Sequence, residues 1–387
     1  MRTTPHKNYF VPSYPNRGVT FVGGQGAYLI EKNGSKYLDF GSNYGVSIFG
    51  YNHPRITRTL DDQLHRLVSL HSSFESDVRH EAARALVEQC GGKMSRVFFS
   101  NSGSEAVEAA LKFAKLFSST SRFIAFQNSY HGKTLGSLSA TSGEKYRQAF
   151  EPLLWNFTHV QLGDKNGLEE AVKGEVAAII LEPVQGEGGL HAAGSEYLEH
   201  LQELCTKRNI LLIVDEIQCG TGRTGTFLAS DQYGLTPDII CLGKGIAGGI
   251  SVGVTLVSES VAARIPLHVH TTTFGGNPLT SAGIVAVLKE FEDGRVLQHI
   301  SDIGAYFLKQ LKTLTHPSIV EVRGTGFMLG MELRENVTSV LKALQEHRII
   351  AIPAGSHIVR FLPPYIVTKK DVDTVISALK EIFGQLR

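Results

Sequence analysis

Two charged residues of the sequence come at the ends of apolar runs of strand length. Asp215 comes after residues 210–214, and Lys244, which lies between two glycines, comes after residues 238–242. In open α/β sheets ligands bind at the carboxyl ends of the strands. A lysine held there is partly desolvated, which lowers its pKa and makes it a nucleophile for carbonyl carbons. Taken singly, Asp215 could also cap the following turn and Lys244 could be a solvated loop residue.

A third group of polar residues lies at the start of an expected helix. Ser102, Gly103 and Ser104 follow the apolar run 96–99 and precede a helical pattern that begins at Glu105. Free backbone N–H groups, the positive end of the helix dipole and two hydroxyls converge at such a point, where a phosphate could bind. Ordinary N-capping by Ser102 or Ser104 explains the same residues without a ligand.

The three groups together are more specific than any one of them. A phosphate site, a carboxylate and a lysine at one edge of a sheet are what pyridoxal 5′-phosphate (PLP) requires: a phosphate grip, a partner for the pyridine nitrogen and an amine for the aldehyde. The sequence therefore predicts a PLP site whose catalytic residues are Lys244 and Asp215.

These residues need a sheet whose strands end side by side. Short apolar runs alternate with longer helical segments between residues 96 and 257. Runs that are apolar throughout are typical of strands covered on both faces, as in a mostly parallel sheet. We therefore expect an α/β core with strands at residues 96–99, 123–126, 177–181, 210–214, 238–242 and 252–257.

The segments before this core predict a hairpin and covering helices. Residues 27–32 and 35–40 flank Asn33-Gly34, a dipeptide that suits a type I′ turn, and are expected to pair as a β-hairpin. From about residue 56 to residue 90, charged and apolar residues recur at helical spacing.

The last quarter of the chain predicts a smaller unit. Helical patterns follow Pro278, and then strands are expected at 319–332 and 349–361, around a helix near 339–347 and before a final helix at 371–386. We expect an N-terminal segment over residues 1–55 that joins the small domain, a large cofactor domain over 56–285, and a small α+β domain over 286–387.

Composition limits the kinds of partner. Lys plus Arg number 38 against 37 Asp plus Glu, so no overall charge attracts nucleic acid or an anionic membrane. The four cysteines are scattered without a C-x-x-C pair or histidines at zinc spacing, which predicts no metal site and a reduced, cytoplasmic setting. No signal-peptide core or run of about 18 apolar residues occurs. The expected partners are small molecules.

Several short motifs, in their order along nearly the whole chain, resemble the class III (ω-amino acid) aminotransferases. The matching strings are residues 101–106, 130–134, 181–189, 215–218, 243–245, 272–278 and 360–364. The resemblance implies the fold-type-I architecture, with a small domain built from both termini. It also implies a homodimer whose active sites lie at the subunit interface.

The resemblance also implies a role for each residue around the cofactor. Ser102, Gly103 and Ser104 would hold the phosphate, joined by Thr273 of the other subunit, and Asp215 would keep the pyridine nitrogen protonated. The remaining cofactor residues would be Tyr130 stacked on the ring, Ile217 on its opposite face, Gln218 at the ring hydroxyl and Lys244 at the aldehyde. Without the motif, Tyr130 and Ile217 would be ordinary core residues.

For the substrates, the resemblance implies a ping-pong transamination with 2-oxoglutarate as amino acceptor. Arg360 would clamp the α-carboxylate, because a guanidinium matches a carboxylate in two parallel hydrogen bonds. Glu187 would pair with Arg360 and swing away when glutamate enters. Thr272 and Tyr44 are further substrate-binding candidates.

Lys133 departs from the acetylornithine and ornithine pattern, which usually has an arginine there to bind the distal carboxylate of the donor. Lysine together with residues 270–274 is more similar to putrescine (diamine) transaminases, whereas residues 360–364 favour the acetylornithine side. The donor stays open between acetylornithine, ornithine, putrescine, 4-aminobutyrate and an analogue from a lysine pathway.

Three other readings compete with the transaminase. A PLP-dependent aminomutase would share the cofactor residues but would not need the pair Arg360 and Glu187. A binding protein without turnover would be favoured only if Lys244 or Asp215 were missing. A nucleotide loop at residues 23–26 or 243–245 does not fit G-x-x-x-x-G-K-[ST].

Overall fold

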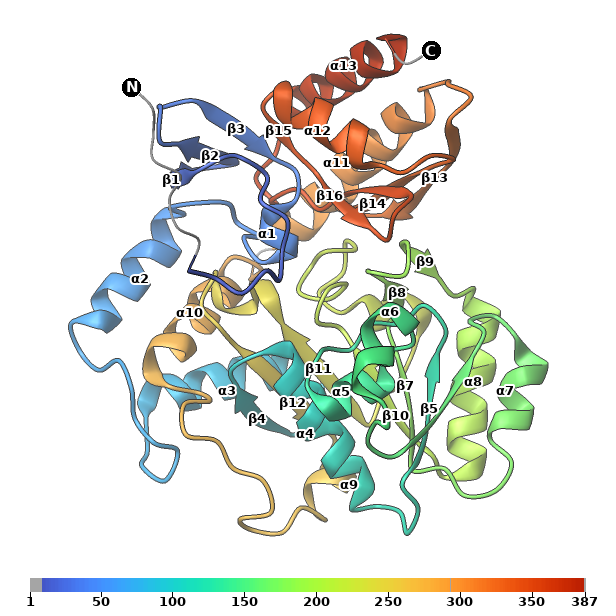
Figure 1. The fold of residues 1–387 in the computed structure, drawn as a ribbon. Helices are drawn as coiled ribbons and strands as arrows, with labels where there is room; N and C mark the ends of the chain where they lie inside the picture. Colours follow the sequence, from blue (N-terminus) through green and yellow to red (C-terminus); the bar gives the residue numbers. More distant parts are fainter. Residues whose placement is uncertain (1–8, 293, 386–387) are drawn as a thin grey trace.

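The computed structural model describes residues 9–292 and 294–385. The chain forms a large α/β part and a smaller part on one side of it (Figure 1). The N-terminal strands and the C-terminal helix both belong to the smaller part, although most of the chain separates them in sequence (Figure 1).

The large part is built on a seven-stranded sheet. Only β12 runs antiparallel to its neighbours, so the predicted mostly parallel sheet is confirmed. All six expected apolar runs are strands, whereas β6 was not predicted because its alternating sequence lies at an edge. In sheet order the strands are β4 (Arg96–Ser100), β12 (Gly253–Val257), β11 (Ile239–Gly243), β10 (Leu211–Asp215), β7 (Ala178–Leu181), β5 (Arg122–Phe126) and β6 (Asn156–Val160).

Helices cover both faces of this sheet, which explains the uninterrupted apolar runs. On β10, Ile213 belongs to the core formed with α4 (Gly103–Lys115), whereas Leu212 and Val214 belong to the core formed with α8 (Ser195–Arg208). Successive side chains of a strand point to opposite faces, so each residue of the run is buried. Each such aliphatic side chain contributes about 1.5–3 kcal/mol of hydrophobic stabilisation.

The N-terminal hairpin is confirmed, but its turn differs from the prediction. The strands β2 (Tyr28–Glu31) and β3 (Lys36–Asp39) pair antiparallel across a four-residue loop. Only Gly34 of the dipeptide has a positive φ, at 87°, and Asn33 does not. The Asn33 side chain instead accepts a hydrogen bond from the Ser35 N–H at 2.8 Å. A type I′ turn needs a two-residue loop with positive φ at both positions, so that expectation was wrong.

The small part contains residues from both ends of the chain. β1 (Phe21–Gln25), β2 and β3 form one sheet with β15 (Ile349–Ile350), which pairs parallel to β3. A second sheet has the order β13 (Ile319–Thr325), β14 (Met328–Leu333), β17 (Ile358–Phe361) and β16 (Ile352–Ala354). Its long helices are α11 (Arg295–Lys312), α12 (Thr338–Glu346) and α13 (Lys369–Gln385), as the sequence indicated.

The other elements connect or cover these sheets. α2 (Pro54–Leu64) and α3 (Asp77–Gln89) pack against α10 (Pro278–Lys289), which runs through the predicted boundary at residue 285. The boundaries themselves stay predictions. Shorter elements are α1 (Ser42–Gly45), α5 (Leu135–Ala140), α6 (Glu144–Arg147), η1 (Gln148–Phe150), α7 (Lys165–Ala171), β8 (Val184–Gln185), β9 (His191–Ala192), η2 (Ala229–Tyr233), η3 (Lys244–Ala247) and α9 (Glu259–Ala262). No helix within the described residues is long and apolar enough to span a bilayer.

One short segment, Ser42–Gly45, has an unusual backbone. Its four residues all have positive φ, between 44° and 83°, which costs roughly 1–3 kcal/mol for each residue other than glycine. The buried carboxylate of Asp39 holds the entry to this turn. Its Oδ1 accepts from the N–H groups of Gly41 and Ser42 at 2.8 and 3.0 Å, and the Tyr51 hydroxyl donates to Oδ2 at 2.6 Å.

Candidate active site

The carboxyl ends of β4, β7, β10 and β11 meet at one edge of the large sheet, since all four strands run in the same direction. The predicted lysine, carboxylate and Ser-Gly-Ser turn therefore lie together, around a cavity of about 230 Å³. The cavity is lined by Ser102, Gly103, Ser104, Tyr130, His131, Gly132, Glu182, Glu187, Asp215, Ile217, Gln218 and Lys244.

Lys244 begins η3 directly after β11 and has a positive φ of 48°. Burial lowers the pKa of its ammonium group, against the opposing effect of the carboxylates of Asp215 and Glu187. The flanking Gly245 is required by packing, because a Cβ there would lie 2.4 Å from Cγ2 of Ile48. The Gly-Lys-Gly motif thus fixes a strained, desolvated lysine at the cavity wall.

Asp215 ends β10 and is buried. Its Oδ2 lies 2.7 Å from Nδ1 of His131, and its Oδ1 accepts from the Ile217 N–H at 3.0 Å. His131 is also buried, and its Nε2 has no hydrogen-bond partner within the described chain. Sequence reasoning gave His131 no role, although it lies inside the string 130–134 that carried the resemblance.

Glu182 is a second acid that sequence reasoning missed. It directly follows β7, and Asp215 is the last residue of β10, so both acids follow an apolar run and the same signal could have found Glu182. Its two oxygens accept from the N–H groups of Tyr130 and Gly186 at 2.9 and 3.0 Å. Burial raises the pKa of Glu182 to about 7, although His131 acts in the opposite direction.

The Ser-Gly-Ser turn caps a helix and also presents hydrogen-bond donors. Ser102 is the N-cap of α4 and its Oγ accepts from the Glu105 N–H at 3.2 Å, as the capping alternative expected. The Ser104 Oγ accepts from the Lys133 N–H at 3.3 Å. Each hydroxyl therefore keeps its own hydrogen for a ligand, and the first N–H groups of a helix have no intrahelical acceptor. The capping and anion-binding interpretations are compatible here.

Arg360 lies on β17 and is fully buried beside the cavity. Its Nη2 lies 2.7 Å from Oε1 of Glu187, and its Nη1 donates to Oε1 of Gln218 at 2.8 Å. The Tyr44 ring centroid lies 5.8 Å from the guanidinium carbon. Glu187 retains 23% side-chain exposure, so it borders open space on the side away from Arg360.

Besides Arg360 and Tyr44, which lie beside the cavity, three more predicted residues are absent from its lining. Lys133 is exposed, and its Nζ lies 5.6 Å from the Tyr146 ring centroid. Thr273 is exposed, and Thr272 uses its hydroxyl oxygen to accept from the Gly275 N–H at 3.1 Å. Within this chain both threonines therefore lie outside the cavity.

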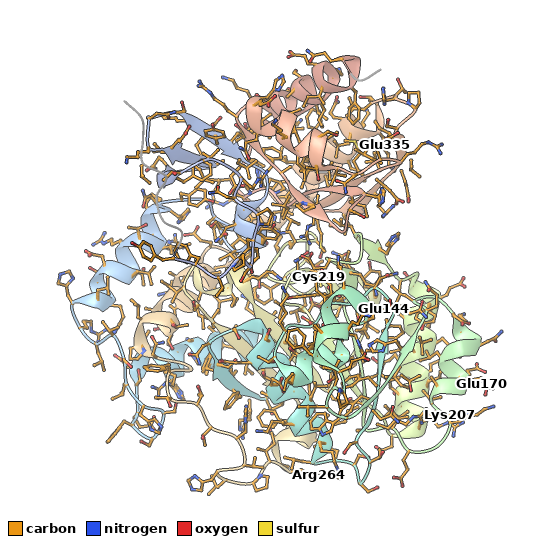
Figure 2. All side chains as sticks on the ribbon, in the orientation of Figure 1. Glu144, Glu170, Lys207, Cys219, Arg264 and Glu335 are labelled. Carbon is orange, nitrogen blue, oxygen red and sulfur yellow. The ribbon has the colours of Figure 1, made fainter. Side chains whose placement is uncertain are left out.

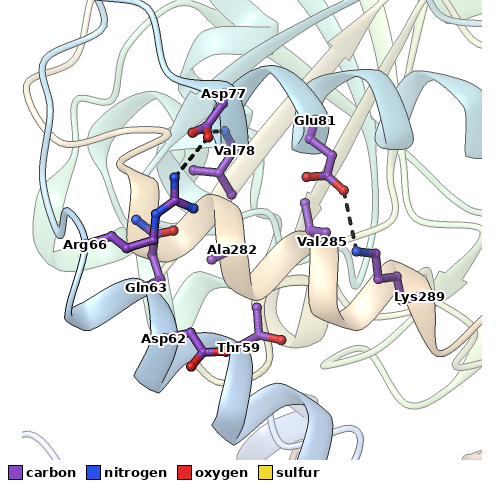
Figure 3. A pocket seen from close by; sticks show the side chains of 10 residues that line it. All are labelled: Thr59, Asp62, Gln63, Arg66, Asp77, Val78, Glu81, Ala282, Val285 and Lys289. Carbon is purple, nitrogen blue, oxygen red and sulfur yellow. Dashed lines mark hydrogen bonds and ion pairs between the residues drawn. The ribbon is translucent and has the colours of Figure 1, made fainter.

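Other parts of the described chain offer no competing chemistry. A cavity of about 200 Å³ lies between α2, α3 and α10, and four of its five charged side chains form two ion pairs (Figure 3). Arg66 lies 3.1 Å from Asp77, and Lys289 lies 3.6 Å from Glu81. No group of three or more metal-ligating side chains occurs among the described residues. The four cysteines are free and buried, including Cys219 between the two parts (Figure 2).

Known proteins with the same architecture are similar over nearly the whole chain. The model of the family "Aminotransferase class-III" matches residues 10–383. The acetylornithine aminotransferase of Aquifex aeolicus is 41% identical over 97% of this chain and 99% of that protein. The [LysW]-aminoadipate semialdehyde/glutamate semialdehyde transaminase of Sulfurisphaera tokodaii is 37% identical over 96% of both.

Solved structures of aminotransferases have the same fold as this chain. The ornithine aminotransferase of Toxoplasma gondii ME49 superposes with a TM-score of 0.93 at 32% identity, over 97% of this chain and 92% of that one. A PLP-bound amine transaminase from an uncultivated Pseudomonas species gives a TM-score of 0.92 at 27% identity, over 100% of this chain and 98% of that one. The resemblance seen in the motifs is confirmed: the chain is an aminotransferase that belongs to the class III family, with the fold-type-I architecture.

Proposed function

We propose that this enzyme transfers the terminal amine of an ω-amino acid or diamine to 2-oxoglutarate, with PLP as cofactor. The observation that carries the proposal is the convergence of Lys244, Asp215 and the Ser-Gly-Ser turn on one cavity, with Arg360 at its side. The predicted cofactor agrees with the family and with the PLP-bound Pseudomonas structure.

The side chains around the cavity fit PLP. Hydroxyls and free N–H groups at the start of α4 suit its phosphate, and the buried carboxylate of Asp215 suits its pyridine nitrogen. Tyr130 and Ile217 would contact the two faces of the ring, and Gln218 would reach the ring hydroxyl with its amide N–H. When bound, the cofactor supplies an aldehyde for the amine and a ring that takes up electron density.

Lys244 is the group that would move the proton. Because burial lowers the pKa of Nζ, a neutral amine is easier to form there than on a solvated lysine. Nζ can take a proton from the donor carbon and return it at a neighbouring atom, as a general acid and base. Asp215, oriented by the His131 imidazole, would place a negative charge at the end of the site that takes the pyridine nitrogen.

Arg360 and Glu187 would distinguish the two substrates. Glutamate and 2-oxoglutarate bring an α-carboxylate that can replace Glu187 on the guanidinium, whereas an ω-amine donor leaves the pair intact. This two-substrate arrangement favours a transaminase over an aminomutase. The PLP-dependent mutase stays the second candidate.

Replacing Glu187 by glutamine should shift preference towards glutamate and 2-oxoglutarate. Glutamine cannot neutralise Arg360, so the guanidinium is left ready for an incoming carboxylate and repels an ammonium group. We expect the ratio of kcat/KM for ω-amine over glutamate to fall about tenfold, the worth of one charge-assisted hydrogen bond. Half-reactions with each substrate measure the ratio, and an unchanged ratio would reject the switch.

A homodimer is also part of the proposal. Ser72 donates to the Gly275 carbonyl at 3.4 Å, so the loops around residues 65–76 and 263–277 lie together. They expose Phe74, Leu267 and Phe274 at 64%, 89% and 60%, an apolar surface that a second copy would cover. That copy would receive Thr273, and Thr272 with it, at its cofactor phosphate.

A cytoplasmic location is also part of the proposal, and the free cysteines support it.

A panel of donors tests the function directly. Acetylornithine, ornithine, putrescine, 4-aminobutyrate and lysine are mixed one at a time with the PLP-loaded enzyme, and the cofactor absorbance is followed. At least one ω-amine should convert the cofactor to its aminated form, and 2-oxoglutarate should reverse the change. Failure of every donor, or a protein that takes up no PLP, would refute the proposal.

A further inference from the structure

Glu182 is a buried acid in the wall of the catalytic cavity, and the proposed reaction does not use it. Burial disfavours a carboxylate unless hydrogen bonds satisfy its oxygens. Two backbone N–H groups do so, because Tyr130 donates to Oε1 at 2.9 Å and Gly186 donates to Oε2 at 3.0 Å. Each oxygen therefore holds a different segment of the active site.

The two segments that Glu182 connects have separate tasks. Residues 127–134 contain Tyr130, which lines the cavity and would stack on the cofactor ring. Residues 182–190 contain Glu187, whose carboxylate lies 2.7 Å from the guanidinium that would clamp a substrate carboxylate. One side chain thus lies between the cofactor contact and the substrate contact.

Further contacts make the two segments one packed unit. Nε2 of Gln185 donates to the Gln127 carbonyl at 2.7 Å. A Cβ at Gly188 would lie 2.2 Å from the Asn128 carbonyl oxygen, so the two backbones are in close contact. A displacement of either segment is therefore transmitted to the other.

Glu187 has little support from its own neighbours in sequence. It lies between Gly186 and Gly188, and glycine leaves the backbone more conformational freedom than any other residue. A side chain at Gly186 would displace Gln218, whose Oε1 would lie 2.0 Å from the added Cβ. The hydrogen bond from the Gly186 N–H to Glu182 restricts the backbone directly before Glu187.

We propose that Glu182 is a positioning residue whose two carboxylate oxygens hold Tyr130 against one face of the cofactor and keep Glu187 on Arg360. This inference rests on the proposed function, which assigns the roles of the residues that Glu182 holds. A carboxylate suits the task, since it accepts at two oxygens that point to different segments. An incoming substrate carboxylate then has to displace a Glu187 that is anchored from behind.

Two substitutions separate position from charge. Glu182→Asp keeps both oxygens and the charge but is one methylene shorter, so it cannot reach both N–H groups. We expect it to bind glutarate, a dicarboxylate that cannot react, about three- to tenfold more tightly, as measured by calorimetry on the PLP-loaded enzyme. It should also change the circular dichroism of the bound cofactor, which reports the side chains around the ring. Glu182→Gln, with one acceptor oxygen, should change at least one of the two readouts.

Glu216 provides the matched control. It is a buried glutamate outside the cavity lining that also accepts from two backbone N–H groups, those of Ala229 and Ser230 at 2.9 and 2.7 Å. Glu216→Asp and Glu216→Gln should lower the melting temperature but leave glutarate affinity and cofactor dichroism at wild-type values. Equal changes in the Glu182 and Glu216 variants would reduce Glu182 to a structural role.

Neither readout requires turnover, so the inference and the proposed function can fail separately. If no donor reacts with the wild type while Glu182→Asp still shifts both readouts, the transaminase function fails and the role of Glu182 stands. If the wild type is active and Glu182→Asp matches it in either readout, the inference is overturned. Tighter glutarate binding in Glu182→Gln alone would mean that Glu182 acts through its charge and not through its position.

Discussion

Lys244→Ala should lower kcat by on the order of 10⁴-fold or more, because both the amine that bonds to the cofactor and the proton carrier are lost. The protein itself should stay folded. Wild-type Lys244 is desolvated and holds a positive φ of 48°, so the cofactor-free variant should melt no lower than the wild type.

Borohydride reduction identifies the residue independently of turnover. In the wild type it should fix the cofactor on the peptide that contains Lys244, and in the variant no lysine should be labelled. Small primary amines added to the variant should restore part of the proton transfer. Lys207→Ala serves as the matched control on the surface of α8. A variant with activity within tenfold of wild type would refute the assignment.

Asp215→Asn should lower kcat by on the order of 10³-fold, comparable to the loss of a preorganised electrostatic group. Asparagine retains one oxygen for the Ile217 N–H or His131 but loses the negative charge that would keep the pyridine nitrogen protonated. The proton transfer at the donor carbon then has no electron sink. Rapid-mixing absorbance of the half-reaction measures the step.

The control for Asp215 is a half-buried carboxylate of the same sheet, Asp238. Asp238 precedes β11, at the opposite end of that strand, and its Oδ2 accepts from the Leu212 N–H at 2.8 Å. Asp238→Asn should change thermal stability as much as Asp215→Asn while it leaves the half-reaction rate near wild type. Equal kinetic losses in both variants would reduce the role of Asp215 to one of packing.

Much of the site could be predicted because strand ends in a buried sheet rarely carry charge without a reason. Asp215 directly follows an uninterrupted apolar run and Lys244 follows another after Gly243, and parallel strands bring such positions to one edge. Glu182, directly after β7, has the same signal and could have been predicted in the same way. The six strands with apolar runs were predictable for the same reason, as both of their faces are covered.

Features that depend on distant partners could not be predicted. The edge strand β6 is partly exposed, so its sequence alternates and gives a weak signal. The pairing of His131 with Asp215 joins residues 84 positions apart, and no local pattern encodes it. The turn at Asn33-Gly34 depends on loop length, which the dipeptide alone does not specify. Thr273 requires a second chain, which leaves its role as a proposal.

The parallel pairing of β3 with β15 has a consequence for the order in which the enzyme is made. Residues 36–39 leave the ribosome early, yet their partner strand is Ile349–Ile350, near the end of a chain of 387 residues. During synthesis the central sheet can therefore close around Lys244 while β3 still presents an unpaired edge. Arg360 emerges later still, after β15. A growing chain thus acquires its reactive lysine well before the clamp that selects its substrates.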